Sequence, residues 1–89
     1  MPRVSFTENL RKHIECPPVV TGGGSLRTVL DQAFEGNPLL RGYVLDDRGR
    51  LRKHMNIFVG QEMVRDRDGL SDPVGEDEDV FIMQALSGG

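Results

Sequence analysis

Hydrophobic and polar residues alternate at the start of the chain and then change period. Residues 4–7 alternate apolar and polar side chains, which predicts a half-buried strand. Three polar residues separate Leu10 from Ile14, and this segment is predicted to be a turn or a short extended arm. Segment 16–20 contains two prolines, which cannot donate the hydrogen bonds of a sheet interior. We therefore expect it to be extended and to lie at a sheet edge.

The clearest element in the sequence is a helix over residues 25–35. Ser25 is a good N-cap residue, and Gly36 supplies a left-handed stop that Pro38 reinforces. Five apolar residues recur at the spacing of one helix face: Leu26, Val29, Leu30, Ala33 and Phe34. Such a stripe is stable only when a sheet or another helix covers it.

The middle of the chain predicts further strands. Residues 39–45 are expected to form a short turn that runs into a strand, with Tyr43 and Leu45 on one side. The polar stretch 46–49 is a strong turn signal. Residues 55–59 are rich in strand-forming side chains, and a turn at Gly60 and Gln61 precedes the next apolar pair.

The last strand is predicted over residues 80–83, after polar connections and loops that include the run 75–79. Its apolar residues are continuous rather than alternating, so we expect it to be central and covered on both faces. The order of elements predicts an α+β fold, with a mixed sheet of four or five strands and one main helix packed on one face. We expect one domain over residues 1–83 and a flexible tail over 84–89.

Size and composition narrow the possible functions. The chain has 89 residues, a net charge of −3 and a single cysteine, Cys16, which cannot form an internal disulfide. The mixture of charge signs favours no nucleic-acid partner, and the lack of a long apolar run favours no membrane partner. No signal-peptide pattern opens the chain, so a cytoplasmic location is expected. A domain this small favours binding, carrying or regulation over catalysis.

The end of the sequence suggests a specific chemistry. Gly88 and Gly89 lack a Cβ, so they can thread a narrow tunnel and leave a terminal carboxylate open to attack. A carboxylate is a poor electrophile and must first be activated, for example as an acyl-adenylate formed with ATP and Mg²⁺. A sulfide equivalent, a thiol or an amine can then displace AMP. The tail is thus expected to be the substrate of another enzyme, with a frayed terminus as the simpler alternative.

Short motifs extend this picture to nearly the whole chain. They are L-R at 10–11, N-P-L-L at 37–40, G-R-L at 49–51, N-I-F-V at 56–59, E-M-V-R at 62–65, G-L at 69–70 and A-L-S-G-G at 85–89. In these motifs and their order, the chain resembles the ubiquitin-like sulfur-carrier family of the MoaD/ThiS type. That family includes the small subunit of molybdopterin synthase and the thiamin sulfur carrier. The spacing from Asn56 to the terminus is similar to the branch that supplies sulfur for cysteine synthesis.

The resemblance implies a β-grasp fold and a thiocarboxylate mechanism. An E1-like activating enzyme, using ATP and Mg²⁺, would adenylate Gly89, to which Gly88 gives access. A desulfurase, a rhodanese or a sulfide source would supply sulfur, and a biosynthetic enzyme would accept it. The protein would be a carrier rather than an enzyme, with no cofactor of its own. The residues expected to contact partners are Ala85, Leu86, Ser87, Phe58 and Met83.

Two other functions stay open at this point. The same adenylate captured by lysine amines would make the protein a modifier, conjugated through Gly89 as ubiquitin is. A non-covalent interaction module, in which the two terminal glycines are incidental, is the third possibility. The fold alone does not separate these functions, because one scaffold hosts many of them.

Other candidate residues favour ordinary structural roles. Cys16 is expected to be a reduced structural thiol, and His13 and His54 lack metal-ligand spacing, so no metal site is predicted. The glycines at 22–24 are expected to form a flexible turn, and residues 76–79 a solvated acidic turn that can steer a basic partner.

The basic stretch around the turn at 46–49 has two interpretations. It contains five residues: Arg48, Arg50, Arg52, Lys53 and His54. A solvated face is the simpler interpretation. Docking on an acidic rim of a partner is the more specific one.

Overall fold

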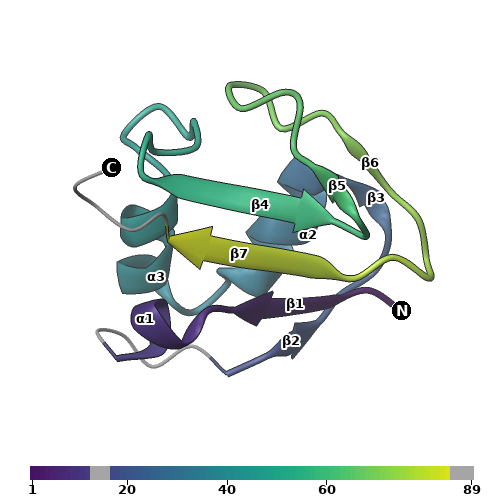
Figure 1. Ribbon diagram of the computed structural model, residues 1–89, viewed down its shortest axis with the longest axis horizontal. Helices are drawn as coiled ribbons and strands as arrows, with labels where there is room; N and C mark the ends of the chain where they lie inside the picture. Colours follow the sequence, from purple (N-terminus) through teal and green to yellow (C-terminus); the bar gives the residue numbers. More distant parts are fainter. Residues whose placement is uncertain (13–16, 85–89) are drawn as a thin grey trace.

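The computed structural model describes residues 1–12 and 17–84 of the chain. The elements are β1 (Arg3–Phe6), α1 (Glu8–Arg11), β2 (Val19–Val20), β3 (Gly24–Ser25), α2 (Leu26–Ala33), α3 (Pro38–Val44), β4 (Met55–Val59), β5 (Glu62–Met63), β6 (Pro73–Val74) and β7 (Val80–Gln84). Five strands form one sheet in the order β2-β1-β7-β4-β5, and β3 pairs with β6 separately. Figure 1 shows α2 and α3 behind this sheet and α1 beside the end of β1. The predicted α+β class with a mixed sheet is confirmed.

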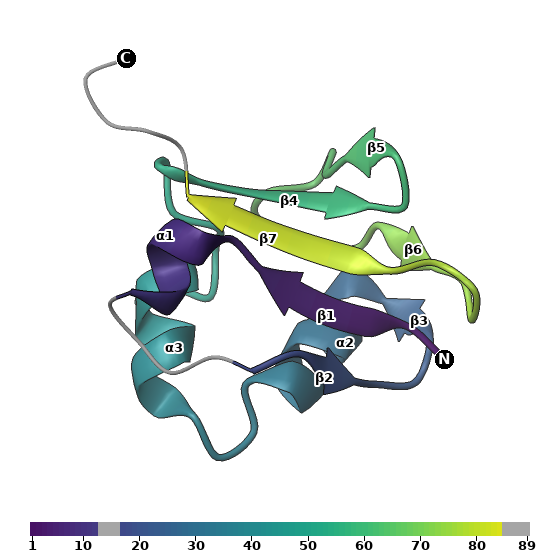
Figure 2. The same cartoon turned by 60° about the horizontal axis from the view of Figure 1, so that its bottom comes forward.

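Strand β7 lies at the centre of the sheet, parallel to β1 and antiparallel to β4. Val80 and Ile82 are buried, whereas Phe81 is 40% exposed and Met83 is half-buried. The central position is as predicted, but the expectation that both faces are covered is wrong. Figure 2 shows that the helices lie on one side of the sheet and leave the other side open. An unbroken apolar run does not reveal which of its residues face a covering layer.

The core fills the space between the covered face of the sheet and the helices. Strand β4 contributes Met55, Ile57 and Val59 to it, which alternate with half-buried residues on the open face. Helix α2 contributes the predicted apolar stripe, all of it buried: Leu26, Val29, Leu30, Ala33 and Phe34. Full burial of each large aliphatic side chain stabilises the fold by about 1.5–3 kcal/mol, so these two stripes hold the sheet and α2 together.

Helix α2 begins where the sequence predicts and ends slightly earlier. The Ser25 Oγ accepts a hydrogen bond from the backbone N–H of Thr28 at 3.2 Å, which makes Ser25 the N-cap. Residues 34–36 form a turn, and Gly36 has a φ of +79°, the left-handed value expected of the residue that ends a helix.

Residues 38–44 form helix α3, so the predicted turn and strand are wrong here. The Asn37 Oδ1 accepts a hydrogen bond from the backbone N–H of Leu40 at 3.3 Å, and Pro38 occupies the first turn. Tyr43 is 39% exposed and Leu45 is buried, so they do not share a side either. Pro38 stops one helix and starts the next, and therefore the sheet is covered by two helices rather than one.

Two more segments differ from the prediction. Residues 8–11 form the short helix α1, not a turn or an extended arm. Leu10 of this helix is fully buried, and its contacts with the core stabilise the helical turn. Residues 24 and 25, expected to be part of a flexible turn and a cap, pair with residues 73 and 74, expected to be loop. These two-residue strands exist only through their contact with each other, and no local pattern marks them.

The predicted edge strand and two of the predicted turns are found. Gln84, expected to open the tail, is instead the last residue of β7, because it pairs with Met55 of β4. Strand β2 is an edge strand that pairs with β1, as the two prolines before it require. The turns at 46–49 and 60–61 contain Gly49 and Gly60, which have positive φ values of 77° and 61°. Within residues 1–12 and 17–84, no helix is long and apolar enough to span a membrane.

Candidate functional site

Residues 85–89 of the predicted tail 84–89 lie outside the described residues, as do His13 and Cys16. The structure does show where the tail begins. Strand β7 ends at Gln84, which lies opposite Met55, the first residue of β4. Because β7 is flanked by β1 and β4, the tail starts from the middle strand at one end of the sheet.

The open face of the sheet carries a row of side chains that crosses four strands. Ser5 of β1 lies opposite Phe81 of β7, Phe81 opposite Phe58 of β4, and Phe58 opposite Met63 of β5. Side chains directly opposite each other in neighbouring strands lie about 4.5–5.5 Å apart at Cβ, so the row is continuous. Met83 extends it toward the end of β7 from which the tail begins.

This row contains both sheet residues that the sequence suggested as partner contacts. Phe58 and Met83 are half-buried on the open face. Phe81 and Met63, which the sequence analysis did not single out, are more exposed, at 40% and 51%. Strand register places these two residues in the row, and the sequence pattern does not reveal that register. Contiguous exposed apolar side chains on a small domain mark a surface for protein contact, so this row is a candidate docking surface.

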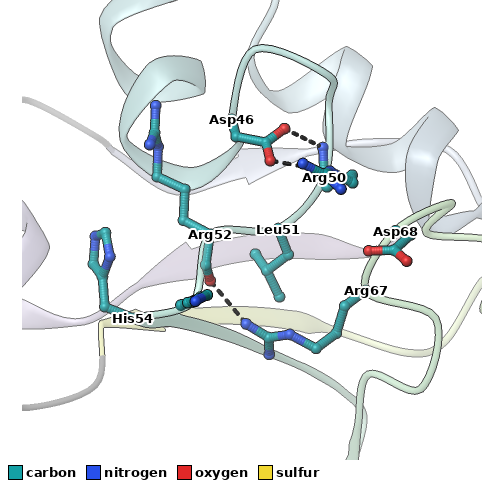
Figure 3. A pocket seen from close by; sticks show the side chains of 8 residues that line it. Asp46, Arg50, Leu51, Arg52, His54, Arg67 and Asp68 are labelled. Atoms are coloured by element: carbon teal, nitrogen blue, oxygen red, sulfur yellow. Dashed lines mark hydrogen bonds and ion pairs between the residues drawn. The ribbon is translucent and has the colours of Figure 1, made fainter.

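A groove of about 490 Å³ lies at the end of the sheet from which the tail begins (Figure 3). Its lining is Asp46, Arg50, Leu51, Arg52, Lys53, His54, Arg67 and Asp68. Four of these residues belong to the basic stretch noted in the sequence. Arg67 and Asp68 come instead from a distant loop that had no assigned role, and only the folded chain brings them here. We call this feature the basic groove.

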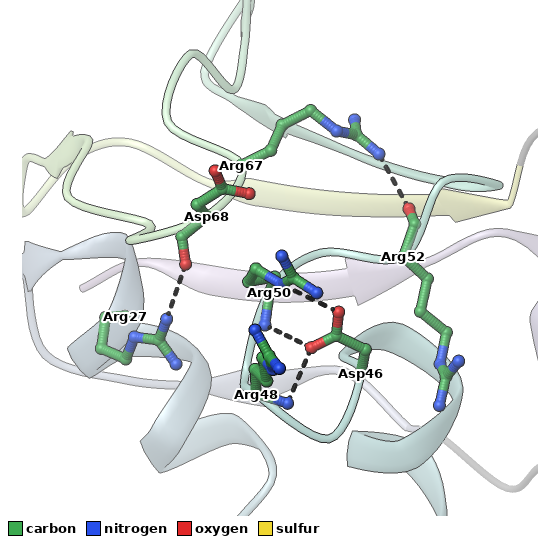
Figure 4. A network of polar contacts seen from close by, with 7 residues as sticks. All are labelled: Arg27, Asp46, Arg48, Arg50, Arg52, Arg67 and Asp68. Atoms are coloured by element: carbon green, nitrogen blue, oxygen red, sulfur yellow. Dashed lines mark hydrogen bonds and ion pairs between the residues drawn. The ribbon is translucent and has the colours of Figure 1, made fainter.

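Backbone carbonyl groups fix the positions of three arginines in and beside the basic groove (Figure 4). The Arg67 Nη2 donates to the carbonyls of Arg52 and Met55, both at 2.8 Å. The Arg52 Nε donates to the Gly42 carbonyl at 2.8 Å, and the Arg27 Nη2 donates to the Asp68 carbonyl at 3.1 Å. Carbonyl groups are dipoles without formal charge, so these bonds orient each guanidinium and leave its positive charge in place.

Asp46 organises the turn at the edge of the basic groove. Its Oδ1 accepts hydrogen bonds from the backbone N–H groups of Arg50 and Arg48, both at 2.9 Å. Its Oδ2 accepts from the Arg50 Nε at 3.1 Å. The Arg50 backbone bond is the main cause that lowers the pKa of Asp46, so this carboxylate stays ionised.

Asp66 organises the loop that carries Arg67, as Asp46 organises its turn. Its Oδ2 accepts a hydrogen bond from the Ser71 hydroxyl at 2.6 Å, and its Oδ1 accepts one from the Gly69 backbone N–H at 2.9 Å. The Ser71 hydroxyl is the main cause that lowers the pKa of Asp66. In the part of the chain that the structure describes, no group of three or more His, Cys, Asp or Glu residues is placed to hold a metal ion.

A mixed five-stranded sheet with helices on one face is the ubiquitin-like β-grasp fold, and solved structures of this class match the whole chain. CysO from Mycobacterium tuberculosis is 26% identical, with a TM-score of 0.79 over 97% of this chain and 100% of that one. A chain of the BexX/CysO complex from Amycolatopsis orientalis is 23% identical, with a TM-score of 0.81 over 100% of both chains.

SAMP1, the small archaeal modifier protein of Haloferax volcanii, is 21% identical, with a TM-score of 0.76 over 98% of this chain and 97% of that one. These structural neighbours are small ubiquitin-like sulfur-carrier or modifier proteins of the MoaD/ThiS type, so the predicted resemblance is confirmed. The sequence matches no protein-family model, and no curated protein is significantly similar to it.

Proposed function

We propose that this protein is a sulfur carrier whose Gly89 carboxylate is adenylated and then converted to a thiocarboxylate. One combined observation supports the proposal. The chain has the fold of CysO and SAMP1 over its full length, and its sequence continues from the central strand into A-L-S-G-G. A carrier must bind several enzymes in succession. An exposed apolar sheet face and a glycine-ended C-terminal segment are features that fit such a carrier.

The proposed cycle has three steps. A Gly89 carboxylate oxygen attacks the α-phosphorus of ATP in an E1-like activating enzyme, which yields an acyl-adenylate and releases pyrophosphate. Hydrosulfide then attacks the acyl carbon, and AMP leaves. If the persulfide of a desulfurase or rhodanese attacks instead, AMP leaves an acyl disulfide, and a thiol must reduce its S–S bond to release the thiocarboxylate. The thiocarboxylate sulfur finally attacks the substrate of a biosynthetic enzyme, and hydrolysis of the resulting thioacyl bond restores the carboxylate. ATP and Mg²⁺ belong to the activating enzyme.

The candidate docking surface fits this role by its position. Five residues follow Gln84 in the sequence, and five residues span at most about 18 Å when fully extended. An enzyme that holds Gly89 therefore comes close to the end of β7 and to the open face. Phe58, Phe81 and Met83 are the apolar side chains that such an enzyme meets there, while Ala85, Leu86 and Ser87 form the segment that it grips.

The test is the transfer of sulfur to the terminus. The protein is incubated with an E1-like enzyme from the same organism, ATP, Mg²⁺ and sulfide, and the intact protein is analysed by mass spectrometry. The expected product has one oxygen replaced by sulfur, and fragmentation places the change at Gly89. One alanine added after Gly89 abolishes the product, whereas one alanine added before Met1 does not. The proposal would be contradicted by sulfur transfer to the variant with alanine after Gly89, or by no transfer to the unmodified protein.

A second function, conjugation to other proteins, is favoured by the likeness to the archaeal modifier protein SAMP1. In that case a lysine amine would attack the adenylate and form an isopeptide bond through Gly89. Tagged protein expressed in its own organism would then carry covalent adducts that survive denaturation and that are lost when Gly88 and Gly89 are deleted. Recovery of free protein and thiocarboxylate alone would count against this second function.

A further inference from the structure

The two ends of the sheet carry opposite charges. The basic groove has three arginines and one lysine against two aspartates, a net charge of +2 when His54 is neutral, although the whole chain has a net charge of −3. The loop that leads into the other end of β7 contains four acidic residues within 76–79, all exposed. The positive end is therefore the one from which the tail begins.

The positive charge of the basic groove is fixed in position before any partner arrives. Arg52 and Arg67 are held by carbonyl groups, so they keep their charge and have already lost much of their rotamer freedom. Ordering a side chain on binding costs about 0.5–1.5 kcal/mol, and a preorganised arginine avoids most of this cost. Among the described residues, Arg50 is the groove arginine whose charge is paired with a carboxylate, that of Asp46.

The shape of the surface favours an extended occupant. Arg52 also lines two neighbouring hollows of about 220 Å³ each, one with Arg48 and Asp47 and the other with Gly42 and Tyr43. Arg52 lines all three hollows, so they form a row of open hollows, here called the strip, along segment 42–54. Small anions are bound best by concave sites that surround them, whereas a strip with several fixed cations matches several carboxylates of one polypeptide.

The strip also lies beside the end of β7. Lys53 and His54 directly precede Met55, and Met55 pairs with Gln84, after which the tail begins. Any enzyme that holds Gly89 is thus within about 18 Å of Gln84, which pairs with Met55, the residue after Lys53 and His54 of the groove. We propose that the basic groove docks an acidic segment of the activating enzyme, at the mouth of the site that receives the tail. The identity of this partner rests on the proposed function, but the preference for an acidic polypeptide does not.

The first test measures binding directly. A ten-residue oligoglutamate peptide is titrated into the ¹⁵N-labelled full chain, and chemical-shift changes are mapped at low salt. The expected changes cluster at residues 50–54 and at Arg67. Lys53→Glu weakens binding about three- to tenfold, because an exposed charge facing an opposite charge is reversed. Arg65→Glu, the same change of net charge at an exposed site outside the groove, leaves binding within about twofold.

Two results of this titration would overturn the proposal. Changes of equal size around Arg3, Arg65 and the groove mean non-specific attraction. Changes in the groove caused by inorganic pyrophosphate, and not by the peptide, mean a site for small anions. A lack of any change caused by the peptide is a third contrary result.

The second test uses the loading reaction with the activating enzyme. Lys53→Glu is expected to raise KM for the carrier about three- to tenfold, leave kcat unchanged and flatten the dependence of kcat/KM on salt. Arg65→Glu does none of these. If the wild-type protein is loaded and Lys53→Glu keeps its KM, the docking proposal fails and the proposed function stands. If the wild-type protein is not loaded, the proposed function fails, and the peptide titration still decides the role of the groove.

Discussion

The two faces of the five-stranded sheet are built from the same strands but differ in burial. Met55, Ile57 and Val59 of β4 lie in the core, whereas Asn56 and Phe58 alternate with them on the open face. The covered face meets the apolar stripe of α2 and loses its contact with water. No helix or strand among the described residues covers the open face, which keeps apolar side chains across β7, β4 and β5. The same alternation thus supplies the core on one face and exposes a candidate docking surface on the other.

Strand β7 shows the contrast between neighbours in sequence. Ile82 is fully buried, while Phe81 beside it is 40% exposed. Both are large and apolar, so hydrophobicity does not distinguish them. Only the position of the helices decides which of the two stabilises the fold. Stability and partner binding are therefore expected to respond to different substitutions.

The largest effect is expected on the covered face. Ile82→Ala should lower the free energy of unfolding by about 2–5 kcal/mol, because it removes buried methyl groups and leaves a cavity. Phe81→Ala should lower it by at most about 1.5 kcal/mol. Urea denaturation of both variants measures the difference, and Ile82→Val, with a loss of about 0.5–1.5 kcal/mol, serves if Ile82→Ala does not fold. Equal losses at positions 81 and 82 would contradict the distinction between the faces.

The next effect concerns the open face and partner binding. Phe58→Ala should lower kcat/KM for loading by the activating enzyme about tenfold, which corresponds to about 1.4 kcal/mol, because an aromatic anchor is lost from the apolar row. Its effect on stability should stay small compared with that of Ile82→Ala. Ser5→Ala, at a small polar position in the same row, is the matched control and should change kcat/KM less than twofold. A Phe58→Ala variant that loads normally would show that this face is not a docking surface.

A smaller effect is expected at the N-terminus of α2, which lies under the covered face. Ser25→Ala removes the acceptor for the Thr28 backbone N–H and should cost about 1 kcal/mol of stability, whereas Ser25→Gly should cost only a few tenths. Thermal unfolding measures both variants. Loading should be unchanged in each, since the cap supports the covering helix and not the open face. Equal losses in the two variants would show that the hydroxyl does not act as a cap.

The smallest effect concerns Asp66, in the loop that supports the basic groove. Its hydrogen bonds from Ser71 and Gly69 lower its pKa in the folded state. The ionised carboxylate therefore adds stability above its unfolded pKa of about 3.9, and this contribution is lost as the pH falls through the lower folded-state pKa. Asp66→Asn should flatten this acid-side loss. Tm values measured from pH 6 to pH 2 test it, and parallel curves for the two proteins would refute it.

The sequence was most informative where a structural signal is local. The cap at Ser25, the apolar stripe of α2 and the glycine turns all depend on a few consecutive residues, and they are found as expected. Helix α3 was missed, although the Asn37 cap and Pro38 are a helix-start signal. Pro38 both prevents continuation of α2 and occupies the first turn of α3, so one proline carries two signals.

The basic groove shows a second kind of limit. The sequence places Arg48, Arg50, Arg52 and Lys53 near one turn, with a solvated face as the simpler interpretation and a docking surface as the more specific one. It did not connect them with Arg67, whose guanidinium reaches the carbonyls of Arg52 and Met55 from a distant loop. Such contacts depend on the path of the whole chain and have no local pattern.

By itself, the sequence determined the α+β class, the two periods of its apolar residues, the edge position of β2 and a tail that ends in two glycines. Local backbone preferences and side-chain periodicity specify these features. The tertiary structure alone decided which apolar residues of β4 and β7 are buried, how Phe58 and Phe81 come to lie opposite each other, and which arginines share a groove. These features depend on strand register and on which face the helices cover, and both are set only when distant segments pack together.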